Sequence, residues 1–268
     1  MPSQFSAVGF RVSTGEDLSA LAGRVAGEAE TIKVAGGEYL KWAPPSGEQL
    51  WLQVSPKGDG MGMNPHFAGK SEVRVGVEAR ISRQGHTALD GTFLGWANPP
   101  AGASTGGDYP FAFDCPDAAT HLQLELPVTL VAQVAAFAQQ VTVYPSREAY
   151  DASQAAQGLS FGSRSFIPSG LFSPMGEPVN PPEAHALFAG HVVEAEPRQN
   201  WITEAPYWWA LVETLGGTFD VVIDPALVSD APRAGNVLSG WFWLSGRLLT
   251  TPSNSTPKPG WIKRLVGR

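Results

Sequence analysis

Histidine ligates metals and shuttles protons more often than other side chains, and this chain has five histidines. They are His66, His86, His121, His185 and His191. No two stand at i, i+2 or i, i+4, and none lies in an HExxH pattern, so the spacing predicts no zinc site. We expect no metal and no cofactor, and a solvent-facing or backbone-bonded role for His191.

The sequence contains no recognisable motif for a catalytic nucleophile. The single cysteine, Cys115, excludes an internal disulfide and any CxxC motif. Its neighbours Asp114 and Pro116 bring no positive charge to lower its pKa, so we interpret it as a structural thiol. No GxSxG elbow, Walker A loop or GxGxxG turn occurs, and the glycines of residues 58–62 are interpreted as a linker. No catalytic residue is predicted.

Nine tryptophans are the most informative excess in the composition. Trp208 and Trp209 are adjacent in one predicted strand and must point to opposite faces, whereas Trp241 and Trp243 share a face. Few Lys or Arg residues lie near them, which favours core packing or a protein interface over stacking on bases. We predict that at least one of the four rings meets the other domain, a protein partner or a second copy of the chain.

A second aromatic group lies early in the sequence. Trp42, Trp51, Gln53 and Glu78 fall on predicted strands and would line a cupped sheet face, forming an apolar pocket with a few polar groups. Ordinary packing of a sheet on a helix explains the two tryptophans equally well. The pocket is the predicted ligand site.

Composition sets the frame for these residues. The chain has 268 residues, 43% hydrophobic and 16% charged, and its 30 Gly and 23 Pro indicate many turns and short strands. The net charge of −7 argues against a main role in binding nucleic acid. No apolar run reaches the ~18 residues of a membrane span, and the first residues do not resemble a secretion signal, so we predict a cytoplasmic protein without membrane contact.

The first elements are predicted from local patterns. Residues 5–12 are strand-like, and Ser13 and Glu16 are spaced as a capping box for a helix that ends at Gly27. Three short strands follow, at residues 31–34, 38–42 and 50–54. The predicted order is βαβββ.

This unit, from FSAVGFRVSTGEDLSALAG to GGEYLKWAPPSGEQLWLQV, resembles one module of the vicinal oxygen chelate (glyoxalase-like) superfamily over residues 5–54. The resemblance implies a metal-ligating His on the first strand and a Glu on the fourth. Those positions hold Ala7 and Trp51, which cannot bind a metal, so the resemblance implies the fold without the metal-dependent chemistry.

Further strands are expected at residues 71–82, 89–97 and 109–115, and we assign residues 1–124 to the glyoxalase-like α+β domain. Residues 126–144 are interpreted as a long strand, although their alanine-rich middle also suits a helix. A short helix over 147–157, a loop over 160–182 and strands at 190–196, 207–214, 218–223 and 237–249 follow. This block weakly resembles a small antiparallel β-barrel of the OB type.

The predicted organisation is strand-rich α+β: domain 1–124, an OB-like β-barrel over 125–250 and a basic flexible tail over 251–268. The favoured function is non-catalytic binding of a small-molecule ligand or a protein partner. One alternative is a metal-independent enzyme that uses the first-domain pocket, with Glu78 or His66 as general base. The other is an OB-type oligonucleotide binder.

Overall fold

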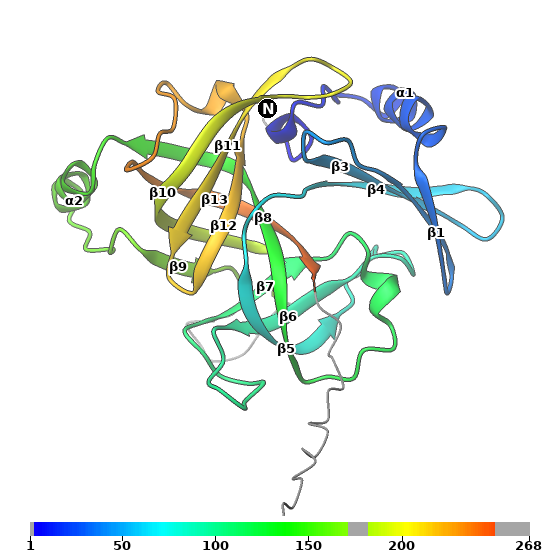
Figure 1. The fold of residues 1–268 in the computed structure, drawn as a ribbon, viewed down its shortest axis with the longest axis horizontal. Coiled ribbons are helices and arrows are strands. Elements are labelled where there is room, and N and C mark those ends of the chain that lie inside the picture. The colour runs from blue at the N-terminus through cyan, green and yellow to red at the C-terminus, as the bar shows by residue number, and fades with distance from the viewer. Residues whose placement is uncertain (1–2, 171–181, 250–268) are drawn as a thin grey trace, which may run out of the picture.

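The computed structural model describes residues 3–170 and 182–249, and within them the chain forms two β-sheets with few helices (Figure 1). The strand-rich α+β class predicted from the sequence is confirmed at this level. The predicted tail, residues 251–268, lies outside the described residues. Among those described, no helix is long and apolar enough to cross a membrane.

The amino-terminal segment differs from its prediction. Residues 5–12 are not a strand; they contain the 3-10 helix η1 (Ser6–Val8), which ends at Gly9 in the left-handed region with φ of 79°. A side chain at Gly9 would collide with Asn200 and the Ala205 carbonyl, so glycine is required there. Helix α1 (Gly15–Ala26) begins with a capping box formed by Thr14 and Asp17, one residue later than predicted.

The first sheet is an antiparallel meander in the order β1-β2-β3-β4. Its strands are β1 (Glu30–Val34), β2 (Gly37–Trp42), β3 (Glu48–Val54) and β4 (Gly60–Phe67). The interpretation of residues 58–62 as a linker is wrong, because residues 60–62 open β4 and residues 58 and 59 form the turn before it. A tight turn explains the difference: the Ser55 amide bonds the Asp59 carbonyl, and Gly58 has φ of 91°.

The second sheet contains the remaining nine strands. They are β5 (Val73–Ile81), β6 (Thr92–Ala97), β7 (Pro110–Asp114), β8 (Val128–Tyr144), β9 (Ser165–Pro168), β10 (His185–Gln199), β11 (Pro206–Thr214), β12 (Gly217–Ile223) and β13 (Val237–Leu248). The strand interpretation of the alanine-rich run is confirmed by β8. Three short helices, η2 (Ala118–His121), α2 (Arg147–Ala156) and η3 (Pro225–Leu227), lie between strands.

Strands β8 and β13 pair along most of their length and belong to two closed circuits. One circuit runs β8-β12-β11-β10-β13, and the other runs β8-β5-β6-β7-β13, closed by the single pair Ser245 with Asp114. The predicted domain boundary at residues 124 and 125 falls between η2 and β8, and β5 pairs with β8 across it. One core cluster contains Val73 and Phe111 as well as Phe219 and Phe242.

The first sheet and α1 pack on the outside of this paired-strand body. A second buried cluster joins Phe10, Trp42 and Phe67 to Trp209 and Trp243 of the large sheet. Figure 1 shows β3 and β4 lying beside the strands of the large sheet. The junction between the two sheets is therefore where side chains from distant parts of the sequence meet.

Candidate functional site

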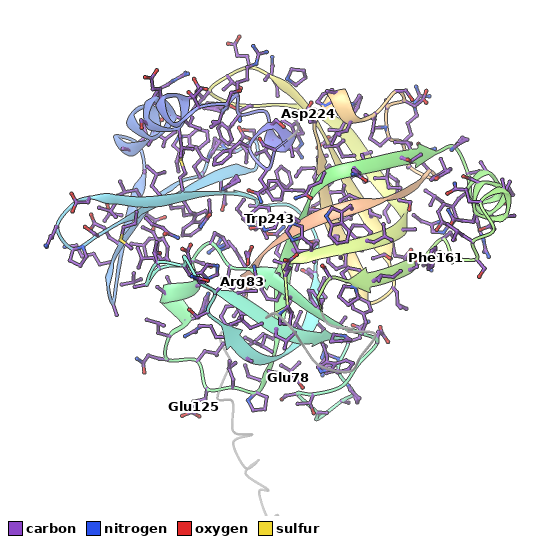
Figure 2. The ribbon with its side chains drawn as sticks, turned by 180° about the vertical axis from the view of Figure 1, so that it is seen from behind. Glu78, Arg83, Glu125, Phe161, Asp224 and Trp243 are labelled. Carbon is purple, nitrogen blue, oxygen red and sulfur yellow. The ribbon has the colours of Figure 1, made fainter. Side chains whose placement is uncertain are left out.

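The structure does not bring the four predicted ligand-site residues together. Trp42 and Trp51 point to opposite faces of the first sheet, one in the cluster beneath α1 and the other against Tyr39 and Leu89. Both rings are buried, as in the packing alternative. Glu78 lies in a bulge of β5, in the other sheet, and Figure 2 shows it well away from Trp243.

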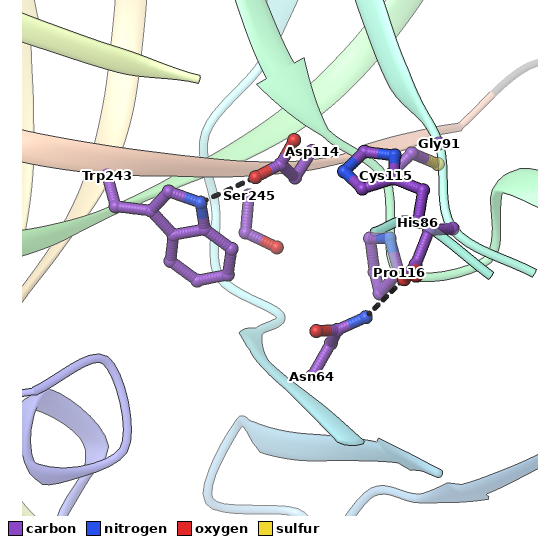
Figure 3. A pocket seen from close by; sticks show the side chains of 9 residues that line it. Asn64, His86, Gly91, Asp114, Cys115, Pro116, Trp243 and Ser245 are labelled. Atoms are coloured by element: carbon purple, nitrogen blue, oxygen red, sulfur yellow. Dashed lines mark hydrogen bonds between the residues drawn. The ribbon is translucent and has the colours of Figure 1, made fainter. Parts of the chain in front are cut away.

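Gln53 connects the prediction to a cavity at the junction of the sheets. Its Nε2 donates to Asp90 Oδ1 at 2.6 Å, and its Oε1 accepts from the Thr87 hydroxyl at 2.8 Å. Asp90 lines a cavity of about 240 Å³ (Figure 3). The lining residues are Asn64, His86, Asp90, Gly91, Asp114, Cys115, Pro116, Trp243 and Ser245.

The residues that line this cavity come from several separate elements. No local sequence motif therefore indicates the cavity. Asn64 is on β4, His86 and Asp90 are on the loop between β5 and β6, and Asp114 ends β7. Trp243 and Ser245 come from β13, and Figure 3 shows them facing His86 and Asn64 across the opening. Only the packing of the two sheets assembles these side chains.

Two carboxylates give the cavity its electrostatic character. Asp90 accepts hydrogen bonds from Gln53, Asn64 and the Thr87 amide. Burial raises the pKa of Asp90, but these hydrogen bonds outweigh burial and hold that pKa below its ordinary value. Asp90 is therefore ionised at neutral pH, yet no ion pair to it occurs among the described residues.

Asp114 is the second carboxylate, and unlike Asp90 it faces a cation. Its Oδ2 accepts from Trp243 Nε1 at 2.7 Å and its Oδ1 from the Thr92 hydroxyl at 2.5 Å. Arg83 Nη1 lies 3.6 Å from Oδ1. Across the cavity, the half-buried His86 has a buried Nδ1 without a hydrogen-bond partner. With Arg83 balancing Asp114, the negative charge of Asp90 dominates the cavity.

A fully paired polar network lies beside the cavity, and we call it the Asp220 network: His66, Gln133, Asp220 and Ser245. Gln133 Nε2 donates to Asp220 Oδ2 at 2.7 Å and to the Phe67 carbonyl at 3.0 Å. Gln133 Oε1 must then accept from His66 Nε2–H at 2.9 Å. His66 Nδ1 is left to accept from the Ser245 hydroxyl, also at 2.9 Å.

The Asp220 carboxylate anchors that network with four donors. Its Oδ1 accepts from Trp209 Nε1 and the Lys70 amide, and its Oδ2 accepts from the Ser71 amide and Gln133. Burial, followed by the charge of Arg247, lowers the pKa of His66 to about 3. A base this weak does not draw a proton from Ser245, so the serine–histidine contact is structural.

Cys115 belongs to a different group at the end of β7. Its Sγ lies 3.1 Å from Asp117 Oδ1, and His121 Nε2 lies 3.7 Å from the same oxygen. Burial, then the Asp117 charge, raises the pKa of the Cys115 thiol well above its ordinary value, so the thiol is protonated and not a ready nucleophile. This agrees with the structural role predicted for it.

The four predicted interface tryptophans separate into two pairs. Trp209 and Trp243 are buried against the first sheet, with Trp209 6.4 Å from the Phe67 ring. Trp208 packs on the core of the large sheet, on the opposite face from Trp209, as strand geometry requires. Trp241 is half-buried and stacks on His185 at 5.7 Å, beside a groove under α2.

The remaining predicted histidine role is also settled by a contact. His191, on β10, bonds the Ser163 hydroxyl at 2.9 Å through Nε2, rather than a backbone group.

Comparison of the chain with family models, curated proteins and solved structures finds no match. Function must therefore be argued from the cavity itself.

Proposed function

We propose that the protein binds a small molecule rich in hydrogen-bond donors, such as an amine or a polyhydroxy compound, in the cavity at the junction of the sheets. The observation that supports this proposal is Asp90, an ionised carboxylate held by neutral donors and facing no cation. A ligand ammonium group supplies the missing positive charge, and a ligand hydroxyl group supplies a further neutral hydrogen-bond donor. His86 Nδ1 and Trp243 offer a second polar contact and an aromatic surface.

The size of the cavity restricts the ligand. Pockets for drug-sized molecules measure about 300–1,000 Å³, and this one measures about 240 Å³. The carboxylates disfavour an anion, because two negative groups would have to be brought together in a partly dehydrated site. A small neutral or cationic molecule is the class that fits both the volume and the charge.

Binding is favoured over catalysis by the state of the nearby reactive groups. The Cys115 thiol is protonated, and His66 is too weak a base to activate Ser245. Glu78, the other proposed general base, does not line the cavity. The metal-independent enzyme therefore has no activated acid–base pair in the described part of this site to support it.

The resemblances of the two regions to an OB-type barrel and to a glyoxalase-like module are part of the same proposal. Five strands in the closed circuit β8-β12-β11-β10-β13 are the number an OB-type barrel uses. Helix α1 followed by an antiparallel sheet resembles a glyoxalase-like module that lacks its first strand, because η1 stands in that place. The oligonucleotide-binding alternative gains no support from a cavity whose dominant charge is negative.

A thermal-shift experiment tests the proposed function, using glucose and ethanolamine as donor-bearing probes and acetate as an anionic probe. At least one donor-bearing probe is expected to raise the melting temperature and acetate is not. Asp90→Asn should abolish the shift, whereas Asp59→Asn, at an exposed carboxylate in the turn before β4, should not. Binding of acetate alone, or an unchanged shift in Asp90→Asn, contradicts the proposal.

A further inference from the structure

The segment that follows β7 gathers three different metal-ligating side chains within one short turn. Cys115 comes directly after β7, Asp117 precedes η2, and His121 is the last residue of η2. One ligand atom from each of the three side chains lies within 4.8 Å of the other two. We propose that these three residues, the Cys115 triad, bind a divalent transition-metal ion such as zinc.

The spacing of the donor atoms suits a tetrahedral ion. With Zn–S near 2.3 Å and Zn–N or Zn–O near 2.0–2.1 Å, neighbouring ligand atoms stand about 3.3–3.6 Å apart. Two of the separations are already close to that range: 3.1 Å from Cys115 Sγ to Asp117 Oδ1, and 3.7 Å from His121 Nε2 to the same oxygen. The third separation, between the sulfur and the imidazole, is within 4.8 Å and has to shorten to the tetrahedral value when the ion binds.

An independent observation points to a missing partner at this position. His121 Nε2 is buried and forms no hydrogen bond; Asp117 Oδ1, at 3.7 Å, is close enough for an ion pair but beyond hydrogen-bond distance. A buried polar nitrogen without a partner costs free energy, and native proteins rarely leave one so. A metal ion among the three donor atoms supplies that partner.

Arg247 orients the Asp117 carboxylate and does not contact the oxygen that would bind the ion. Its Nε and Nη2 lie 3.0 and 2.9 Å from Asp117 Oδ2, the oxygen that faces away from the triad. Oδ1 therefore remains for the ion, and the guanidinium fixes the orientation of the carboxylate, as outer hydrogen bonds do around many metal ligands. The Arg247 guanidinium lies over the Trp51 ring, with Cζ 5.0 Å from the ring centroid, and this contact holds the guanidinium in place.

The donor set selects the class of ion. A thiolate, an imidazole and one carboxylate oxygen suit zinc or a similar transition metal, whereas calcium and magnesium require oxygen ligands. The thiol proton leaves to solvent when sulfur binds, so the ion meets two negative ligands and one neutral ligand. Three protein ligands leave a fourth coordination position for water or a small molecule.

The sequence prediction of no metal arose because it considered paired histidines. Here the spacing is Cys-x-Asp-x3-His, with a single histidine, and the sequence does not show that η2 turns these residues toward one another. Cys115 also lines the ligand cavity, but the two proposals rest on different observations, because Asp90, which supports the cavity proposal, is not a member of the triad.

Cobalt(II) titration of the untagged full chain, after dialysis against a chelator, tests the proposal. We expect one ion per chain and a thiolate-to-cobalt charge-transfer absorption that added zinc removes. Cys115→Ser should eliminate that absorption, and His121→Gln should weaken cobalt binding by about tenfold or more. His191→Gln changes a histidine that bonds Ser163, outside both the triad and the cavity, and should leave the titration unchanged.

Two results would overturn the proposal: a wild-type chain that shows no charge-transfer absorption at saturating cobalt, or one whose binding is the same in both triad variants. Circular dichroism melting establishes that each variant is folded. If Cys115→Ser does not fold, His121→Gln decides the question, because His121 is the most exposed member of the triad.

Discussion

Two neighbouring groups of polar side chains differ in one respect: whether their buried atoms have partners. In the Asp220 network both ring nitrogens of His66, the amide of Gln133 and both oxygens of Asp220 are hydrogen-bonded. Around the cavity and the Cys115 triad, His86 Nδ1 and His121 Nε2 are buried and have no hydrogen-bond partner. Strand β13 serves both groups, with Ser245 in the first and Arg247 beside the second.

This difference in hydrogen bonding indicates which group stabilises the fold and which group can bind a ligand. A buried polar network that is completely paired fixes a unique arrangement of the elements it joins, and here it joins β4, β8, β12 and β13. A buried polar atom without a partner is an unmet cost that a ligand can remove. We therefore infer a structural role for the Asp220 network, and the contrast supports the binding roles proposed for the cavity and the triad.

The largest expected effect is the removal of the carboxylate at the centre of the network. Asp220→Ala removes the acceptor of four donors: the Trp209 indole, one N–H of the Gln133 amide, and the backbone amides of Lys70 and Ser71. We expect a loss of about 3–5 kcal/mol in the free energy of unfolding, measured by urea denaturation. Asp224→Ala, which removes the cap of η3, is the control and should cost about 1 kcal/mol. Equal losses in the two variants would contradict the structural role.

The second effect is a pH dependence that originates at His66. Its pKa falls from 6.5 to about 3 on folding, so the unfolded chain binds a proton over that interval and the folded chain does not. His66 therefore contributes full stability above pH 6.5, and that contribution is lost as the pH falls toward 3, with a slope of about 1.4 kcal/mol per pH unit.

Urea denaturation of wild type and His66→Gln between about pH 6 and pH 4 measures this slope, because that range lies between the two pKa values of His66. The variant should lose the slope assigned to His66, while His191→Gln, at a histidine outside the network, should keep it. A wild-type slope that survives in His66→Gln would show that another group produces the acid sensitivity.

The comparison also explains how far the sequence alone could predict the molecule. Alternating patterns and turn residues predict β5, β8, β11 and β12 well, because those signals are local. The strand over residues 5–12 failed because η1 depends on Gly9 packing against Asn200 and Ala205, nearly two hundred residues away. A local pattern contains no information about that contact.

The candidate site was harder to predict for the same reason. Asp90 and Asp114 are ordinary loop and strand-end residues until the two sheets pack together. Of the predicted ligand residues only Gln53 touches the cavity wall, through Asp90. The Cys-x-Asp-x3-His spacing was visible in the sequence, but only the turn at η2 shows that the three side chains converge.

A third prediction compares two buried tryptophans that each donate to a carboxylate, one in each group. Trp209 donates to Asp220 and Trp243 to Asp114. Trp209→Phe removes one hydrogen-bond donor from the Asp220 carboxylate, which is buried away from water. The free energy of unfolding should fall by about 1–3 kcal/mol more than a packing change alone would cause. Trp243→Phe leaves Asp114 facing a cavity that admits water, so its cost should be smaller, as measured by thermal melting. The reverse order would contradict the separation of the two groups.

The smallest expected effect concerns Trp241, which lies on β13 outside both groups and so gives the baseline for the strand. Its ring is half-buried, and the neighbouring Leu187 and Ile167 are each 37% exposed, so truncation opens no large cavity. Trp241→Ala should change the free energy of unfolding by about 1 kcal/mol or less. If this apolar face is an interface, the same change weakens association in sedimentation experiments, whereas Trp209→Ala destabilises the monomer by about 3–5 kcal/mol. A loss in Trp241→Ala as large as that of Trp209→Ala, without any change in association, would place this ring in the core and remove it from the predicted interface.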